Sequence, residues 1–294
     1  MRLRTGLVAV VIALTTTVAA QVHVTETMEA TARPANAPAT IGELVERMQS
    51  ERSASVISVE WSKESFIIPV AGNAPGGGGT YFRSDVVFNN DRLAGQRIAV
   101  GWMAQGINNC AAPLQYFTLS ANSVTIADDF VGQTLGKTGL GAVLVVAVDA
   151  TGALDEEGLI DGYSRIWTPQ PGSPSGTTSQ NFTAIDVQDS IGSLPATLMG
   201  LKQSNQYRTN VGIVNMDNAA AHTWTFTSIF NGRVTTVSVQ PCSMALTGAA
   251  ANSASPTGNV AFTVKSDGFG FWWSGFGSST DNTTGDGWVA RAIQ

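Results

Sequence analysis

A nine-residue segment that occurs twice constrains the fold of this chain more than any other feature. The sequence "FRSDVVFNN" begins at Phe82, and "YRTNVGIVN" begins 125 residues later, at Tyr207. Each copy has an aromatic residue, an arginine, a hydroxyl residue, an aspartate or asparagine, a valine and a final asparagine. A second strand-like segment follows each copy and ends at Gly106 or Gly232, and "GAVLVVAVD" corresponds loosely to "GNVAFTVKS" further along. Ordered matches at a nearly constant offset indicate an internal duplication.

Alternation of apolar and polar residues predicts that the duplicated unit consists of β-strands. Residues 98–102 and 224–226 show this pattern, and Gly, Asn and Pro separate such segments. Period-two patterning at short spacing is typical of antiparallel sheets packed in a sandwich. Helical periodicity is nearly absent outside residues 40–53, where Thr40 and Glu43 form a capping box. The sequence therefore predicts an all-β fold of two tandem antiparallel β-sandwich domains from an internal duplication, with a short N-terminal helix.

The duplication and the composition together predict the domain boundaries. The first residues combine two arginines, a short apolar run and small residues before a cleavage point, as in an export signal. The apolar run is shorter than the roughly 20 residues that a membrane-spanning helix needs. We expect a secreted or periplasmic protein without membrane insertion. The predicted segments are a signal peptide (1–20), a leader with the short helix (21–55), a first sandwich (56–170), a linker (171–180) and a second sandwich (181–294).

The charge of the chain excludes two classes of partner. Loss of the predicted signal removes two arginines and no acid, so the net charge of −6 becomes −8. An acidic chain without a Lys/Arg cluster lacks the electrostatic footprint for nucleic acid or an anionic membrane. The expected partners are a protein or a glycan at the cell exterior, with self-assembly as an alternative.

Two cysteines, Cys110 and Cys242, lie in different copies. In an oxidising compartment an even number of cysteines favours a disulfide. Two buried free thiols are the alternative, and the sequence leaves both open. A zinc site would need two ligands besides the two cysteines, and His23 and His222 are the only histidines in the chain.

Four glycines, Gly76 to Gly79, precede the first copy of the repeated segment. The second copy has "LKQSNQ" in their place, and the run lacks the Lys-Ser/Thr of a phosphate-binding loop. We interpret the run as a mobile turn, with a backbone site for an anion as the alternative.

The repeated segment itself carries a charged pair in one copy only. Arg83 and Asp85 share one face of the predicted strand, whereas Arg208 is followed at the same spacing by Asn210. A catalytic pair would not ordinarily lose its charge in one of two copies. We therefore predict a structural role for all four residues, tying a strand to neighbouring loops.

At these residues the chain resembles an uncharacterised group of secreted bacterial proteins with paired β-sandwich (Ig-like) domains. The resemblance rests on the repeated strand, on "YSRIWTPQPG" from Tyr163 and on "SSTDNTTGDG" from Ser278. It covers most of residues 60–294 and departs in the glycine run and in "DVQDSIGSLPATLMG". The resemblance implies architecture and export, and it carries no activity over to this chain.

Motifs for catalysis are weak. There is no Gly-x-Ser-x-Gly and no His-Glu-x-x-His, so a triad would have to use His222, which precedes a predicted strand. The acidic segment 149–161 is glycine-containing, and Asp149, Asp155 and Glu157 are weak calcium candidates, although their spacing matches no EF-hand. An acidic hairpin loop is the alternative, and we expect no other cofactor.

The aromatic segment "FGFWWSGF" is the leading candidate for a binding surface. Alternation places Phe269, Phe271 and Trp273 on one face, which we assign to the core, and Trp272 with Phe276 on the other. Trp272 could stack on a sugar ring, pack on the partner domain or contact another protein. The function predicted from these observations is that of an exported non-enzymatic β-sandwich protein for binding or for extracellular or surface structure. The alternative is a carbohydrate-binding or carbohydrate-degrading envelope protein.

One predicted strand differs from the others. Residues 142–148 are apolar on both faces, and such strands are normally covered on both sides. We expect the helix or the second domain to cover its outer face.

Overall fold

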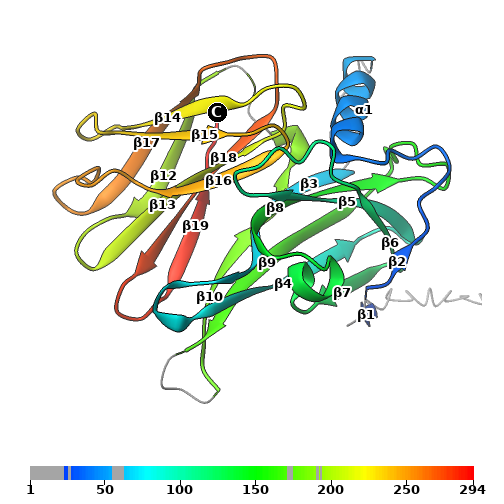
Figure 1. Ribbon diagram of the computed structural model, residues 1–294, viewed down its shortest axis with the longest axis horizontal. Helices are drawn as coiled ribbons and strands as arrows, with labels where there is room; N and C mark the ends of the chain where they lie inside the picture. Colours follow the sequence, from blue (N-terminus) through cyan, green and yellow to red (C-terminus); the bar gives the residue numbers. More distant parts are fainter. Residues whose placement is uncertain (1–22, 26–27, 55–62, 171–174, 190–191, 193) are drawn as a thin grey trace, which may run out of the picture.

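The computed structural model describes residues 23–25, 28–54, 63–170, 175–189, 192 and 194–294. The predicted signal peptide and the first residues of the predicted first sandwich lie outside this part of the chain. The described residues are mostly β-strand with one short α-helix (Figure 1), as predicted for an all-β chain. No helix among them is both long and apolar enough to cross a membrane.

The first half of the chain forms two facing layers of strands. One layer has the order β3-β8-β5-β6 and the other contains β7, β4, β9 and β10 side by side, with β3 and β4 paired at one corner. Ile68, Val86 and Val100 come from both layers and are buried between them. The strands are β3 (Ser65–Pro75), β4 (Tyr81–Asn90), β5 (Gln96–Ala104), β6 (Gln115–Leu119), β7 (Ser123–Ala127), β8 (Gly139–Val148), β9 (Ile160–Pro169) and β10 (Thr177–Thr183).

Shorter elements complete this half. Two leader strands, β1 (His23–Thr25) and β2 (Ala30–Thr31), pair with β7 and β6, so part of the leader belongs to the sheet. The strand β11 (Ile185–Asp186) pairs with β3. The helical turns are η1 (Gly77–Gly79) in the glycine run, η2 (Phe130–Thr134), which is a π-helical turn, and η3 (Val187–Asp189).

The second half also forms two layers of strands, here as two separate sheets. Its sheets have the orders β12-β17-β14-β15 and β16-β13-β18-β19. Large aromatic side chains, among them Trp224, Phe262 and Trp273, fill the space between them. The strands are β12 (Ala196–Lys202), β13 (Tyr207–Asn215), β14 (His222–Ser228), β15 (Val234–Val239), β16 (Ser243–Gly248), β17 (Asn259–Ser266), β18 (Trp273–Asp281) and β19 (Gly287–Arg291).

The two copies of the repeated segment occupy corresponding places. β4 lies between β7 and β9, and β13 lies between β16 and β18. A bulge after Ile68 interrupts the pairing of β3 with β8, and a bulge after Leu198 interrupts that of β12 with β17. After the bulges, Ala71 pairs with Gly141 and Leu201 pairs with Val260, so Gly141 and Val260 hold corresponding positions in the two halves. The loose correspondence inferred from the sequence instead aligns Gly141 with Gly258, two residues earlier.

Two positions of the repeated segment have a common structural role. Asn90 and Asn215 are fully buried at the ends of β4 and β13, and each side-chain amide donates to backbone carbonyls of neighbouring loops. The hydroxyl of Ser84 accepts a hydrogen bond from Gly72 N of β3 at 2.7 Å. Thr209 makes the equivalent contact with the other sheet, donating to the carbonyl of Lys202 in β12. These side chains tie the two layers of each half together.

The boundary between the halves lies later than predicted. β10 pairs with β9 along its length, and β11 pairs with β3. Residues 177–186 therefore belong to the first half, although the sequence assigned them to the linker and the second sandwich. Local composition could not reveal this, because their pairing partners are distant in the chain.

A shared core joins the helix and both halves. The helix α1 (Ile41–Ala54) begins at the predicted capping box, in which Glu43 N donates to Thr40 Oγ1 at 3.3 Å. Gly101 of β5 allows close packing of α1, since a Cβ there would lie 2.9 Å from a side-chain carbon of Ile41. Leu144 and Val148 are buried in the same cluster as α1, and so is Met244 of the second half. Both predicted covers of β8 are thus present, and that prediction is confirmed.

Cys110 and Cys242 form a disulfide between the halves. Cys110 lies in the loop between β5 and β6, and Cys242 directly precedes β16. The side chain of Asn109 in the same loop donates to the carbonyl of Cys242 at 3.1 Å. Of the two states that the sequence left open, the structure contains the bonded one.

Candidate functional site

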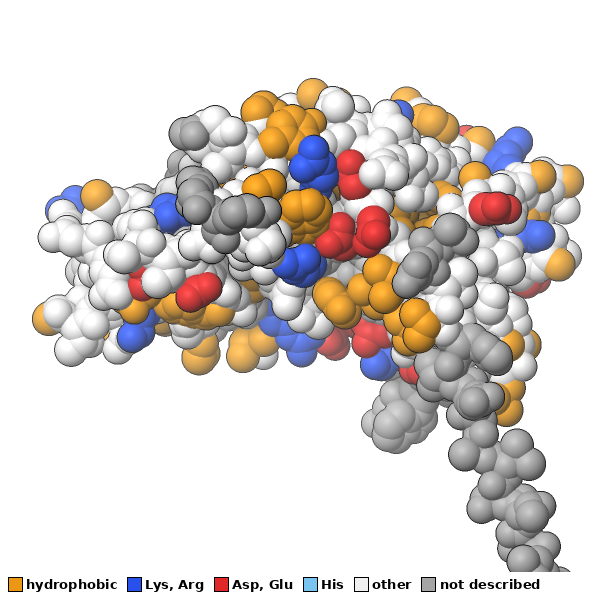
Figure 2. Space-filling view, turned by 90° about the horizontal axis from the view of Figure 1, so that it is seen from below, with side chains coloured by type: hydrophobic (Ala, Val, Ile, Leu, Met, Phe, Trp, Pro, Cys, Tyr) orange, Lys and Arg blue, Asp and Glu red, His pale blue; other side chains and the backbone are white. Residues whose placement is uncertain are grey.

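A pocket of about 420 Å³ lies on the outer face of the β4–β9 layer. It is formed by β4, β9, the start of β10 and the segment that leads from β7 into η2. Figure 2, which views the molecule from below, shows acidic, basic and hydrophobic side chains gathered near the middle of this face. The lining residues are Arg83, Asp85, Asp128, Asp129, Gln133, Arg165, Trp167 and Thr177.

Strand register brings the charged residues of this pocket together. Arg83 of β4 is directly opposite Trp167 of β9, and Asp85 is directly opposite Arg165. Asp129 follows β7 and adopts a left-handed backbone conformation with φ of 43°. The side chains of Asp85 and Asp129 are 18% and 14% exposed, whereas those of the two arginines are nearly 40% exposed. The carboxylates therefore lie deeper, and the guanidinium groups face solvent.

The pairing of these charges differs from the sequence prediction. Arg83 does not pair with Asp85 on its own strand; its Nε is 3.8 Å from Asp129 Oδ2. Asp85 instead lies 3.5 Å from Arg165 NH1 and accepts a hydrogen bond from Asp129 N. Residues two apart on one strand point the same way, but the neighbouring strand and the adjacent loop offer closer partners.

Arg83 uses little of its hydrogen-bonding capacity. Within the described chain its guanidinium donates no hydrogen bond; it lies 5.2 Å from the ring centre of Tyr81 and 5.8 Å from that of Trp167. An arginine flanked by aromatic rings is stabilised by cation–π attraction, and its N–H groups remain available to a ligand. Arg165 donates to Thr177 Oγ1 at 2.7 Å.

Other polar groups around the pocket are also uncommitted. Asp128 and Gln133 are exposed, and their side chains form no hydrogen bond with other described residues. Asp129 Oδ1 and Trp167 Nε1 are buried atoms without a hydrogen-bond partner in the described structure. Unsatisfied buried polar groups are rare in folded proteins and call for a functional or structural reason.

The second half lacks this pocket chemistry at the corresponding positions. Arg208 faces Thr280 rather than a tryptophan, and Asn210 faces Ser278 rather than an arginine. Arg208 donates to Asn282 Oδ1 at 2.8 Å, in the turn after β18. The same strand arrangement thus forms without the charged cluster, so the cluster is not a requirement of the fold.

The aromatic segment is arranged differently from the prediction. Phe276 is fully buried, where it contacts Phe182 of β10 edge-on at 6.2 Å, so its assignment to a binding surface is wrong. Trp272 is partly buried against the cluster between the halves, as in one of the three alternatives for it. Phe271 and Trp273 are core residues as predicted, but Phe269 is 84% exposed. Alternation defined two faces here, but both faces of β18 are covered.

His222 has two carboxylate partners. Its Nε2 is 2.8 Å from Asp217 Oδ2, its Nδ1 is 3.2 Å from Asp267 Oδ1, and its ring stacks on Phe271 at 3.8 Å. Burial opposes ionisation of Asp217 most strongly, but hydrogen bonds from His222 and from two backbone N–H groups outweigh it and lower the pKa of Asp217. Because both ring nitrogens contact carboxylates, His222 is not hydrogen-bonded to a hydroxyl or thiol nucleophile.

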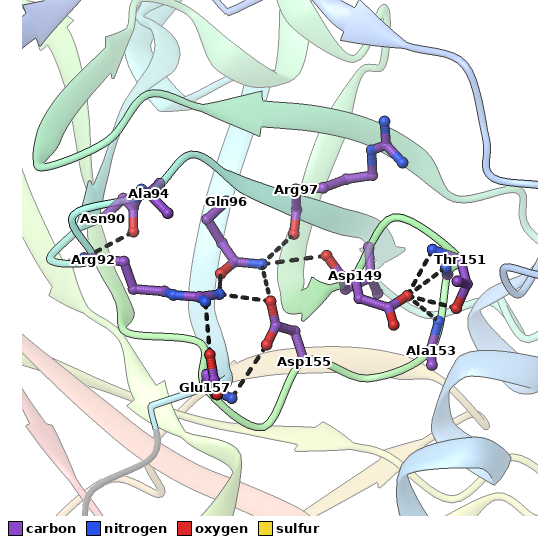
Figure 3. Close-up of polar contacts among 12 residues, drawn as sticks. Asn90, Arg92, Ala94, Gln96, Arg97, Asp149, Thr151, Ala153, Asp155 and Glu157 are labelled. Carbon is purple, nitrogen blue, oxygen red and sulfur yellow. Dashed lines mark hydrogen bonds and ion pairs between the residues drawn. The ribbon is translucent and has the colours of Figure 1, made fainter.

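The weak calcium candidates have separate protein partners (Figure 3). Asp149 Oδ1 accepts hydrogen bonds from Thr151 and the following backbone N–H groups, and the Thr151 hydroxyl contributes most to lowering the pKa of Asp149. Asp155 and Glu157 instead bind Arg92, at 2.6 and 3.0 Å. In the described residues no group of three or more acidic, His or Cys side chains is arranged to hold a metal. The arrangement is that of an acidic loop fastened by an arginine.

Arg92 provides a useful contrast with Arg83. Its guanidinium donates to Gln96, Asp155 and Glu157 (Figure 3). This arginine is fully engaged in holding one loop. Among the described residues, Arg83 donates no hydrogen bond and has only the ion pair with Asp129 at 3.8 Å. This difference could not be read from the sequence, because both arginines lie near acids in the chain.

Comparison with known proteins adds no relative: no protein-family model matches the chain, and no curated protein matches it.

Proposed function

We propose that this chain is an exported, non-enzymatic protein with two β-sandwich domains that arose by internal duplication, and that it binds a ligand in the pocket over β4 and β9. The corresponding strand orders and bulges of the two halves support the duplication. The disulfide between Cys110 and Cys242 supports export, because such bonds persist in oxidising compartments.

One observation carries the binding function. Arg83 lies beside two aromatic rings, and its ion pair with Asp129 uses Nε and leaves its other N–H groups without a hydrogen bond to described residues. The side chains of Asp128 and Gln133 in the same pocket also form no hydrogen bond with described residues. A concave site with a few convergent polar groups and an aromatic wall is the usual form of a small-ligand site. The second half retains the arginine, as Arg208, but has Thr280, Asn210 and Ser278 at the positions of Trp167, Asp85 and Arg165. This difference supports a role of the cluster other than folding.

Binding without catalysis is favoured by the contacts of His222. A general base must reach the proton that it removes, and both nitrogens of His222 are directed to carboxylates on the second half. The pocket over β4 and β9 contains carboxylates paired with arginines rather than a nucleophile with a base.

A ligand screen with paired variants tests this proposal. The full chain is screened by thermal shift against a mixed library of oligosaccharides, short peptides, organic acids and nucleotides, since a ligand at about 100 times its Kd stabilises the fold by about 2.7 kcal/mol. We expect at least one compound to raise the Tm of the wild type and of Arg208→Gln by similar amounts and that of Arg83→Gln clearly less. A screen without hits, or hits that raise the Tm of Arg83→Gln as much as that of the wild type, would overturn the proposal.

A further inference from the structure

We propose that the pocket over β4 and β9 binds a neutral saccharide by one of its sugar rings. This inference rests on the proposed binding function and names the ligand class. Three side chains that line the pocket, Arg83, Asp128 and Gln133, form no hydrogen bond with other described residues, although Arg83 is ion-paired with Asp129 through Nε.

Free donors and free acceptors lie side by side around the pocket. The guanidinium of Arg83 can only donate, the carboxylate of Asp128 can only accept, and the amide of Gln133 can do both. A sugar ring carries adjacent hydroxyl groups, each of which donates one hydrogen bond and accepts others. Such a ligand can use all three groups at once, whereas an anion that carries no hydroxyl group cannot donate a hydrogen bond to the carboxylate of Asp128.

The charge of the lining argues against an anionic ligand. Three aspartates and two arginines line the pocket, and the exposed Asp128 has no cationic partner among the residues that the structure describes. The chain as a whole also carries a net charge of −6. Like charges raise the energy of an approaching anion, so a neutral polar ligand fits this surface better.

The pocket also offers apolar surface of suitable shape. Trp167 is half-buried and lines the pocket. Tyr81, outside the pocket lining, is 37% exposed, and its ring centre lies 5.2 Å from the Arg83 guanidinium. A pyranose ring has a face of C–H groups that can pack on an aromatic ring while its hydroxyls point outward. The volume of about 420 Å³ lies in the range of small-molecule sites.

The changes in affinity caused by two substitutions, Arg83→Gln and Asp128→Asn, test the inference. The full chain is titrated by isothermal calorimetry with cellohexaose, maltohexaose, xylohexaose, mannohexaose and chitohexaose, and with trigalacturonic acid and inorganic phosphate as anionic probes. We expect a neutral probe to bind and Arg83→Gln to weaken it by about tenfold or more, as for a lost hydrogen bond to a charged group. Asp128→Asn should also weaken a neutral sugar, whereas it should strengthen the binding of an anion.

Two control variants make the same Arg→Gln and Asp→Asn changes in the second half and leave the pocket intact. Arg208→Gln alters the corresponding strand position in the second half, and Asp286→Asn removes an exposed acid there. Both should bind the neutral probe as the wild type does.

Three results would overturn the saccharide class. Binding of only the anionic probes, or of none of the probes while a compound of another class depends on Arg83, would refute it and leave the proposed pocket function in place. A neutral probe whose affinity is unchanged by both Arg83→Gln and Asp128→Asn binds elsewhere on the molecule.

Discussion

Replacing Phe276 by alanine should destabilise the protein strongly, because this side chain belongs to the core between the two halves. Phe276 is fully buried, and its ring lies 6.2 Å from that of Phe182 at an interplanar angle of 88°. Gly212 makes room for it, since a Cβ at that position would be 2.3 Å from the Phe276 ring. A large cavity would remain after truncation, with the first half on one side and the second on the other.

The magnitude follows from burial. Truncation of a buried phenylalanine to alanine costs about 3–5 kcal/mol. The matched control is Phe269→Ala in the same aromatic segment, because Phe269 is 84% exposed, and surface substitutions usually change stability by less than about 0.5 kcal/mol. In a double-mutant cycle with Phe182→Ala, the edge-on contact should appear as a coupling of about 0.5–1.5 kcal/mol.

Urea unfolding followed by tryptophan fluorescence and by far-UV circular dichroism measures these differences. Two probes are needed because the halves need not unfold together, and only coincident transitions justify a two-state free energy. The reasoning would be refuted if Phe276→Ala lay within about 1 kcal/mol of the wild type, or if Phe269→Ala cost as much as Phe276→Ala.

Three further predictions concern the disulfide, acid stability and the repeated asparagine. Removing the disulfide by changing Cys110 and Cys242 to alanine should lower the free energy of unfolding by roughly 4–5 kcal/mol, because the disulfide closes a loop with a sequence separation of 132. Reductant should lower the urea midpoint of the wild type and leave that of the variant unchanged. An equal effect on both would contradict this. Asp217 has a pKa below its ordinary 3.8, so it contributes stability that is present above about pH 4 and lost as the pH falls through the folded pKa. Asp217→Asn should therefore be less stable than the wild type at pH 7, and the difference should shrink as urea titrations are carried below about pH 4. A difference that does not shrink would exclude this origin. Asn215→Ala leaves three backbone carbonyls without their donor and should lower stability by about 2–3 kcal/mol, with a loss under about 0.5 kcal/mol contradicting the role assigned to the repeated segment.

Much of the local structure could be predicted from short-range patterns. Side chains alternate across a strand, so the pattern of residues 98–102 indicated a strand directly. The capping box at Thr40 and Glu43 located the start of α1, because a helix leaves its first N–H groups without partners. The repeated segment also predicted that β4 and β13 would occupy corresponding places. β4 lies between β7 and β9, and β13 lies between β16 and β18.

The candidate site could be predicted only in part. Arg83 and Asp85 were singled out, but for a structural role, and Trp167, Arg165 and Asp129 were not placed beside them. These residues come from β9 and from the end of β7, and only the pairing register places them next to β4. No signal within one strand specifies which distant strand lies beside it.

Tertiary structure also decided which aromatic residues are exposed. Alternation separates the two faces of β18, but it identifies the buried face only when the other face meets water. Here both faces are covered, one by the sheet β12-β17-β14-β15 and the other by the first half, so Phe276 and Trp273 are both buried. The sequence by itself determined the strands, the repeat and the apolar character of β8; the packing of one half on the other decided burial and assembled the pocket, because both depend on contacts between residues far apart in the chain.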